Sequence, residues 1–167
     1  AGDVNGDGLA DLIVGAHYAD PGSPAPSSAG ESYVVFGKTS STFVNLASLG
    51  AGGFRIDGIE AGDISGYSVS GAGDVNGDGL ADLIVGAFGA DPGTPARASA
   101  GESYIIFGKT SSTLVDLSTL GAGGFRIDGI LAGDHSGRSV SGAGDVNGDG
   151  LADLIVGAHY ADPGSPA

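Results

Sequence analysis

The sequence predicts an all-β protein made of repeated four-stranded units, about two and a third of them in 167 residues. Alignment of the chain with itself gives a period of 71 residues, and residues 1–71 and 72–142 differ at only 14 positions. Within each unit, short apolar or alternating runs lie between clusters of Gly, Pro, Ser and Asp, which favours strands over helices. The 34 glycines agree with this, because a chain that turns so often supports few long helices.

The repeat divides the chain into three parts. Residues 1–71 form the first unit, residues 72–142 the second, and residues 143–167 a partial third unit that holds an acidic loop and the strand after it. Residues 1–25 and 143–167 are identical, which indicates a larger period of 142 residues or a recent duplication. Because the chain begins inside the repeated motif at Ala1, we expect it to be a piece of a longer polypeptide.

Four strands are predicted for each repeat, and one set spans residues 66–71, 82–87, 103–108 and 124–129. The second strand, DLIVGA, is a continuous apolar run suited to burial on both faces. The fourth, GFRIDG, alternates, with Phe125 and Ile127 on one face and Arg126 and Asp128 on the other. This alternation predicts a half-exposed edge strand, in which the arginine pairs with the aspartate two residues on or with another neighbouring acidic group.

Residues 111–121 present the one candidate helix, because Leu114, Leu117 and Leu120 recur at intervals of three. The β-branched residues among them argue against a stable helix. We therefore expect a surface loop here, with a short helical turn as the alternative.

The charge balance excludes some classes of partner. Acidic residues number 20 and basic residues 6, and the formal charge of −14 opposes binding to nucleic acid or to anionic membrane surfaces. Divalent cations are the natural counterions of such a chain. The absence of cysteine excludes disulfides and thiolate metal sites, and no apolar run approaches the length of a membrane span, so no membrane insertion is expected.

An acidic, glycine-rich segment, GDVNGDGLADLIVGA, begins at Gly2, Gly73 and Gly144. Numbered from its first aspartate, the loop has Asp, Asn, Asp and Asp at positions 1, 3, 5 and 9, with Gly at 6 and Leu at 7. Side chains at 1, 3 and 5 point inward when the backbone curls around a cation, glycine at 6 permits the reversal, and the carbonyl at 7 adds an oxygen. The predicted metal ligands are Asp3, Asn5, Asp7, Leu9, Asp11, Asp74, Asn76, Asp78, Leu80, Asp82, Asp145, Asn147, Asp149, Leu151 and Asp153.

This all-oxygen donor set favours Ca²⁺, one ion per loop and three in all, over zinc or copper, and it suits Mg²⁺ less well. An EF-hand is rejected, because position 12 is Val14 instead of a bidentate Glu and the following run is strand-like. The alternative is that NGDG forms only a hairpin turn. A turn alone does not require the aspartates at positions 1 and 9, which all three copies carry. We expect a structural ion, since the clustered carboxylates repel one another without one.

The string SGYSVSGAGDVNGDGLADLIVGAFGADPG, followed by AGESYIIFGK, resembles the FG-GAP repeat of integrin alpha subunits and of large bacterial surface and secreted proteins. The resemblance covers both full units and the partial third. It implies blade-like, four-stranded antiparallel repeats of a seven-bladed β-propeller, with calcium bound at a loop on one face. Ser65-Gly66 replaces the usual Phe-Gly, and Gly86-Ala87-Phe88 replaces Gly-Ala-Pro. Because the chain is too short to close a ring, it is expected to form a propeller sector or an open repeat array.

No catalytic or cofactor-binding residue is predicted. His17 corresponds to Phe88 and His135 to Ile64 in the other unit, so the histidines do not recur beside a shared nucleophile and acid. We interpret them as surface or packing residues, and we expect no enzymatic activity.

The sequence therefore supports a calcium-stabilised structural or adhesion repeat, part of a longer bacterial surface protein or filament, located outside the cell or on its surface. Its expected partners are neighbouring repeats of the same or identical chains, and a protein or glycan ligand is also considered. One alternative is a ligand-binding β-propeller module that recognises a protein or glycan. A third hypothesis is a noncatalytic segment of a secreted enzyme.

Overall fold

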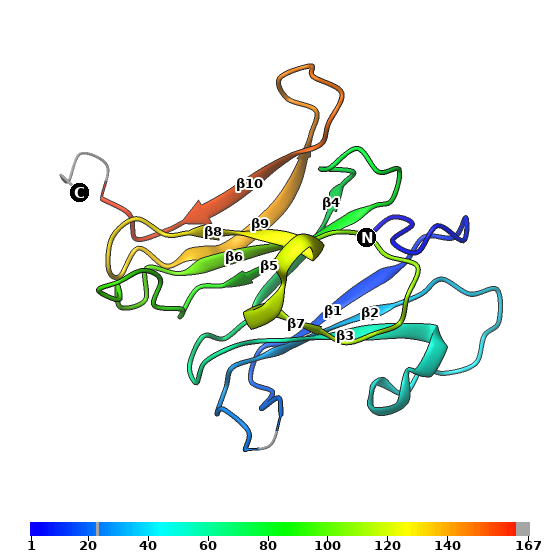
Figure 1. Cartoon of the computed structure of the whole chain (residues 1–167), viewed down its shortest axis with the longest axis horizontal. Coiled ribbons are helices and arrows are strands. Elements are labelled where there is room, and N and C mark those ends of the chain that lie inside the picture. Colours follow the sequence, from blue (N-terminus) through cyan, green and yellow to red (C-terminus); the bar gives the residue numbers. More distant parts are fainter. Residues whose placement is uncertain (23, 163–167) are drawn as a thin grey trace.

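The computed structural model describes residues 1–22 and 24–162 and confirms the all-β fold class. The strands form three neighbouring sheets, which Figure 1 shows following one another along the chain. The helical elements of the described residues are four single turns of 3-10 helix, η1 (Leu46–Ser48), η2 (Gly50–Gly52), η3 (Leu117–Thr119) and η4 (Gly121–Gly123). None of the helices in this part of the chain is long and apolar enough to cross a membrane.

The first sheet has the strand order β1-β2-β3-β7. Its strands are β1 (Leu12–Ala16), β2 (Glu31–Val35), β3 (Gly53–Asp57) and β7 (Val115–Asp116). The first three strands are antiparallel neighbours. Strand β7 belongs to the second sequence unit and pairs in parallel with β3, with Val115 opposite Ile56. The second unit thus lends the first a short outer strand, which the repeat pattern does not predict.

The central sheet is fully antiparallel in the order β4-β5-β6-β8. Its strands are β4 (Ser68–Gly73), β5 (Asp82–Ala87), β6 (Glu102–Ile106) and β8 (Gly124–Asp128). They correspond to the four strands predicted at residues 66–71, 82–87, 103–108 and 124–129. A further antiparallel pair, β9 (Ser136–Gly144) and β10 (Asp153–Ala158), follows and lies against β4 and β5.

Apolar cores fill the spaces between the sheets. Leu83 and Val85 of β5 belong to a cluster with Phe54 and Ile56 of β3, whereas Ile84 belongs to a second cluster packed by residues of β9 and β10. Successive side chains of a strand point to opposite faces, so β5 supplies both cores and all of its residues are buried. Each such aliphatic side chain stabilises the fold by about 1.5–3 kcal/mol. The predicted burial of DLIVGA on both faces is confirmed.

The fourth strand of a unit differs in exposure between the two units. It is half-exposed in β8, which has no further strand beside it among the described residues, and covered in β3, which pairs with β7. Phe125 of β8 is 41% exposed, but the equivalent Phe54 of β3 is 2% exposed. The reason is the pairing of β7 with β3 and the burial of Leu117, which follows β7, in the same core as Phe54. The prediction of an edge strand therefore holds for β8 and is wrong for β3.

The segment that carries β7 also contains the helical turns that were the alternative to a loop. The carboxylate of Asp116 accepts a hydrogen bond from the Ser118 N–H at 2.9 Å and thereby caps η3. Asn45 caps η1 in the first unit in the same way. These turns are too short to produce a helical period in the sequence. Strand β7, which precedes η3, forms only because it pairs with β3 of the first unit.

Two glycines allow adjacent sheets to approach backbone to backbone. A Cβ atom on Gly86 of β5 would overlap the carbonyl oxygen of Gly137 in β9, and one on Gly15 would overlap that of Gly66. Only glycine fits such an approach. At the equivalent position in β10, a Cβ on Gly157 would meet the hydroxyl of Ser139, a side chain that can rotate.

We expect Gly86→Ala to lower the free energy of unfolding by about 2–4 kcal/mol, because the sheets would have to move apart. Gly157→Ala is the matched control and should cost less than about 1 kcal/mol, since only a serine side chain must move. Chemical denaturation of both variants measures the difference. Equal losses would contradict the close approach of β5 to β9.

Candidate metal-binding loops and the opposite aromatic row

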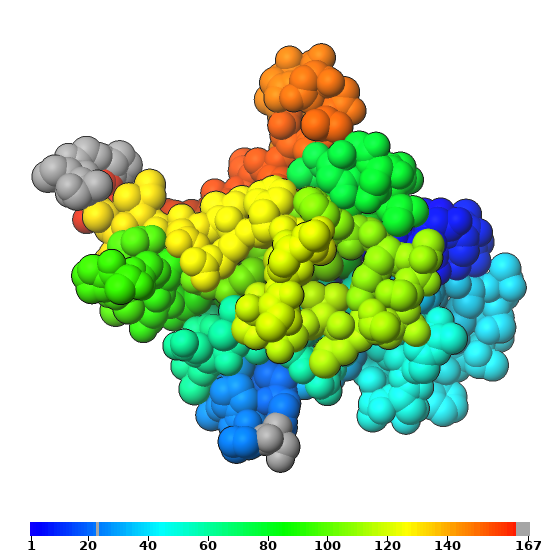
Figure 2. Space-filling view, in the orientation of Figure 1, coloured from blue at the N-terminus to red at the C-terminus, as the bar shows by residue number. Residues whose placement is uncertain are grey.

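The three acidic loops lie near one another at the same end of the strands. Residues 3–10 precede β1, residues 74–81 connect β4 to β5, and residues 145–152 connect β9 to β10. Figure 1 shows the three loops (dark blue, green and orange) along one side of the molecule. In Figure 2 the third loop, in orange, projects from the body of the protein.

Adjacent loops are joined by backbone hydrogen bonds. The Ala81 N–H of the second loop donates to the Asp3 carbonyl of the first at 2.9 Å, and the Ala152 N–H of the third donates to the Asp74 carbonyl at 3.0 Å. The same geometry therefore recurs at both contacts. Each loop is therefore in direct contact with the next.

The aspartate at position 1 organises each loop. In the second copy, one carboxylate oxygen of Asp74 accepts from the N–H groups of Gly77 at 2.7 Å and Asp78 at 3.1 Å, and the other accepts from Gly79 at 2.9 Å. Gly77 and Gly79 have φ of +78° and +88°, in the left-handed region that turns the backbone around the carboxylate. The same bonds recur in the first and third copies.

Positions 3 and 5 form a second set of contacts at the open side of the loop. The amide of Asn76 donates to Asp78 at 2.8 Å and accepts from the Asp78 N–H at 2.9 Å. The other carboxylate oxygen of Asp78 accepts from the Leu80 N–H at 2.8 Å. Both side chains belong to exposed residues, so they can turn toward a cation without disturbing a core.

The aspartate at position 9 is buried and connects three segments. Asp82 has no exposed surface, and its two oxygens accept from the N–H groups of Val75 in the loop and of Gly108 after β6, each at 2.8 Å. Burial is the largest influence on this carboxyl and raises the pKa of Asp82 above its ordinary value, while the two N–H donors act in the opposite direction. Asp11 has the same two bonds in the first copy.

The third copy lacks part of this arrangement. One oxygen of Asp153 accepts from the N–H groups of Val146 at 2.7 Å and Asn147 at 3.3 Å. No glycine among the described residues donates to the other oxygen, which lies 3.5 Å from the Asn147 amide. Asp153 is therefore attached to its own loop but to no further strand within the described residues.

The predicted ligands thus lie close to one another within each loop. Their side-chain oxygens accept hydrogen bonds from the backbone N–H groups of the loop and do not surround a common point. In residues 1–22 and 24–162, no group of three or more acidic or histidine side chains is arranged to hold a metal ion as it stands. The donor chemistry still fits a hard cation. A carboxylate has about four lone-pair positions, and the loop carboxylates use only some of them to accept N–H groups, so the others are free for an ion. The metal ligands stay a prediction.

Asp82→Ala should lower the free energy of unfolding by about 3 kcal/mol in metal-free buffer, because two buried N–H groups would lose their acceptor. Asp153→Ala is the matched control and should cost about 1 kcal/mol, since its partners are exposed. Urea unfolding in the presence of a chelator makes the comparison. A smaller loss for Asp82→Ala than for Asp153→Ala would contradict the bridging role of the buried carboxylate.

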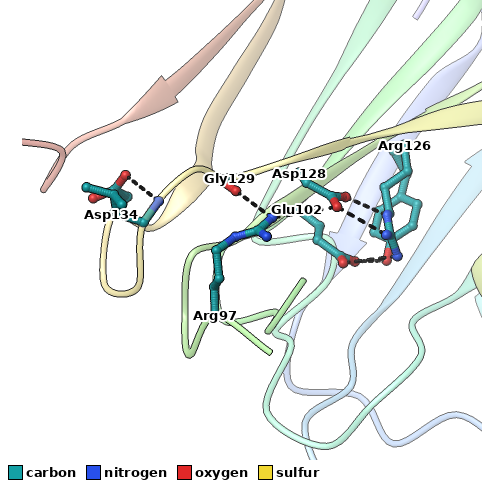
Figure 3. Close-up of polar contacts among 8 residues, drawn as sticks. Arg97, Glu102, Arg126, Asp128, Gly129 and Asp134 are labelled. Atoms are coloured by element: carbon teal, nitrogen blue, oxygen red, sulfur yellow. Dashed lines mark hydrogen bonds and ion pairs between the residues drawn. The ribbon is translucent and has the colours of Figure 1, made fainter. Parts of the chain in front are cut away.

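Strands β6 and β8 of the central sheet, with Arg97 from the segment before β6, carry a network of charged side chains, shown in Figure 3. Arg126 lies 3.1 Å from a Glu102 oxygen and 2.6 Å from an Asp128 oxygen, and Arg97 lies 3.8 Å from Asp128. The Tyr104 hydroxyl donates to Glu102. Burial, followed by this hydrogen bond, raises the pKa of Tyr104, and burial also raises the pKa of Glu102.

The pairing of Arg126 with Asp128 was predicted and is confirmed, as is that of Arg55 with Asp57. Sequence reasoning allowed a further acidic partner but did not identify it as Glu102. Glu102 lies opposite Asp128 only because of the register between β6 and β8, and the sequence does not specify that register.

An acidic pocket of about 300 Å³ lies between the first and second units. Its lining includes Glu60 and Asp63 from the first unit and Asp91 and Glu102 from the second. Asp63 is only 7% exposed, and burial raises its pKa to about 6, with further upward contributions from the three other carboxylates. The Glu60 N–H donates to Asp63 at 2.9 Å and opposes this shift.

Asp63 should make stability depend on pH. Because its folded pKa of about 6 exceeds the ordinary 3.8, the folded chain takes up a proton that the unfolded chain does not between these values. The contribution of this group therefore becomes more favourable as pH falls through that window. Asp63→Asn should raise the free energy of unfolding by about 2 kcal/mol at pH 7.5, and the difference from wild type should vanish below about pH 4. Thermal unfolding across pH 4–8 measures it, and a pH-independent difference would contradict the explanation.

A row of rings lies at the end of the strands opposite the acidic loops. We call it the aromatic row, and its members are His17, Tyr67, Phe88, His135 and His159. Successive ring centroids are 5.1, 4.8, 5.4 and 5.6 Å apart. The row crosses all three sequence units and contains every histidine of the chain. The repeat pattern did not reveal it, because the rings that meet are 21 to 50 residues apart in the chain.

Comparison with known proteins agrees with the repeat architecture. The family model of the FG-GAP repeat matches residues 1–35, 65–106 and 136–167. The chain is similar to integrin alpha-PS2 of Drosophila melanogaster, with 31% identity over 164 residues, which is 96% of this chain and 11% of that protein. It is also similar to integrin alpha-E of Mus musculus, with 38% identity over 98 residues, which is 56% of this chain and 8% of that protein. The chain therefore spans only a small part of the length of these relatives.

Proposed function

Because the chain belongs to the FG-GAP repeat family and is similar to integrin alpha subunits, we propose that it is a calcium-stabilised structural or adhesion repeat of an extracellular protein. The observation that carries the proposal is the threefold recurrence of one acidic loop with one set of internal hydrogen bonds. The same proposal places the repeats in a longer bacterial surface protein or filament. It includes no catalytic step.

Each loop would bind one Ca²⁺ through the side-chain oxygens at positions 1, 3 and 5, the backbone carbonyl at position 7 and the carboxylate at position 9. In the second copy these groups belong to Asp74, Asn76, Asp78, Leu80 and Asp82. The bound ion supplies positive charge that offsets the repulsion among the three carboxylates. Asp74 is already turned inward by its three N–H donors, so ion binding requires movement mainly of the exposed side chains at positions 3 and 5.

The position of the loops supports a structural role for the ion. The loop joins two strands of one sheet, and its backbone bonds to the loop of the next unit. The buried aspartate adds a bond to the segment after the third strand. An ion that orders the loop therefore stabilises the sheet and the contact between neighbouring units together.

Neighbouring repeats of the same or identical chains are the proposed partners. Leu12 of β1 and Ile155 of β10 are 63% and 60% exposed, whereas the equivalent Leu83 and Ile84 of β5 are fully buried between sheets. The apolar faces that the first and third units expose therefore correspond to the faces that the second unit buries against its neighbours. Adhesion and location outside the cell are proposed from the similarity to integrin alpha subunits.

Addition of about 10 mM CaCl₂ to metal-free protein should raise the free energy of unfolding by about 1–3 kcal/mol per loop, given the submillimolar to millimolar affinity typical of extracellular calcium modules. Calorimetric titration should give three sites. Asp78→Ala should remove one site and about a third of the stabilisation. Differential scanning calorimetry with and without calcium measures both effects.

The matched control is Asp116→Asn, which removes one negative charge outside the loops and introduces the residue that the first unit has at the same place, Asn45. It should leave three sites. If calcium changes neither the melting temperature nor the heat of titration, the structural-calcium part of the proposal fails. Equal stabilisation of both variants would show that the ion acts only as a general counterion, which also contradicts it.

A further inference from the structure

Arg138 occupies a special place in the aromatic row. Its guanidinium carbon lies 4.8 Å from the centroid of the Tyr67 ring and 4.9 Å from that of Phe88, so it lies over two rings at once. Cation–π contacts of this kind hold a guanidinium in a defined orientation while its N–H groups stay free to donate. His135, which follows Phe88 in the row, accepts the backbone N–H of Arg138 at its carbonyl.

Arg138 is also distinguished by its lack of a carboxylate partner. Arg55, Arg97 and Arg126 each lie within 4 Å of at least one acidic side chain. Among residues 1–22 and 24–162, no acidic side chain pairs with Arg138, although the chain has 20 acidic residues. The nearest acidic residue along the chain, Asp134, is buried, and its carboxylate accepts the Leu131 N–H at 3.1 Å.

The fold does not require an arginine at this position. The first unit has Tyr67 at the place of Arg138, and the corresponding strands β4 and β9 both form. The two units also differ at two more members of the row, where His17 corresponds to Phe88 and Ile64 to His135. The acidic loops, in contrast, are identical in all copies. The row is therefore a surface whose chemistry changes between units on an unchanged scaffold.

We propose that Arg138 and the adjacent rings of the aromatic row bind a carboxylate side chain of an acidic segment in a protein partner. A guanidinium donates two parallel N–H bonds to a carboxylate, and arginine and tyrosine are residues typical of interface centres. A protein partner is favoured over a glycan, because the guanidinium already lies over one face of Tyr67 and one face of Phe88, where a sugar ring could otherwise stack. Tyr18 and Tyr160, 70% and 63% exposed, border the row and offer further contact area.

The proposal is independent of calcium binding and is tested on the whole chain with calcium present throughout. The probe is the peptide acetyl-Glu-Tyr-amide, titrated while the Nε–H resonances of the four arginines are followed by NMR. The Arg138 resonance should shift and saturate, and the other three should not. Acetyl-Gln-Tyr-amide should bind at least about tenfold more weakly, because it lacks the charge-assisted pair.

Arg138→Tyr introduces the residue of the first unit and is therefore expected to fold. In wild type the bound peptide should also shift the ring resonances of His135 and His159, which lie in the aromatic row. In Arg138→Tyr the peptide should no longer cause these saturable shifts. Arg138→Lys should weaken binding about tenfold, since an ammonium does not form the paired bonds. Lys38→Gln removes a positive charge near the acidic loops and should change nothing.

The proposal is overturned if no saturable shift occurs at Arg138, or if Arg138→Tyr binds the peptide as wild type does. It is also overturned if glucuronate shifts Arg138 at concentrations equal to or lower than the peptide, since that result would assign the site to a glycan. If calcium does not stabilise the chain but the peptide still binds at Arg138, only the calcium proposal is refuted.

Discussion

The fold depends on a carboxylate that is buried at the start of the second strand of each complete unit. A buried carboxylate is tolerated only when its oxygens are satisfied, and Asp82 accepts from the backbone of the loop and from the residue after the third strand. These bonds bring the loop, β5 and the end of β6 to one point. Asp11 does the same for the first unit. The acidic character of the loop is thus partly structural, apart from any cation.

The units of the chain are stabilised mainly by one another. β5 is buried on both faces because sheets lie on either side of it, and β7 extends the sheet of the preceding unit. Loop-to-loop hydrogen bonds and the close approach at Gly86 complete the contact. Such nearest-neighbour contacts are typical of repeat proteins, in which a single repeat cannot bury its apolar faces alone. A cation bound in the loop would therefore act at the contact between units as well as within one sheet.

The two ends of the strands differ in chemistry. One end carries the three acidic loops, which are identical in sequence and share the hydrogen bonds to the aspartate at position 1. The other carries the aromatic row, with all three histidines and Arg138, and three of its positions differ between the units. A constant set of loops and a variable row are consistent with a scaffold that keeps its internal contacts and changes its surface. Recognition and stabilisation are then assigned to opposite ends.

The sequence by itself determined the repeat, the four main strands of a unit and the composition of the loops, because these depend on local patterns such as the continuous apolar run DLIVGA and the aspartates around NGDG. It also predicted the pairing of Arg126 with Asp128, since alternate residues of a strand share a face. Only the tertiary structure decided that β3 is covered, that Glu102 joins Arg126, and that rings from three units form one row. The reason is physical: these contacts join residues far apart in the chain, and their formation depends on strand register and on the packing of one unit against the next.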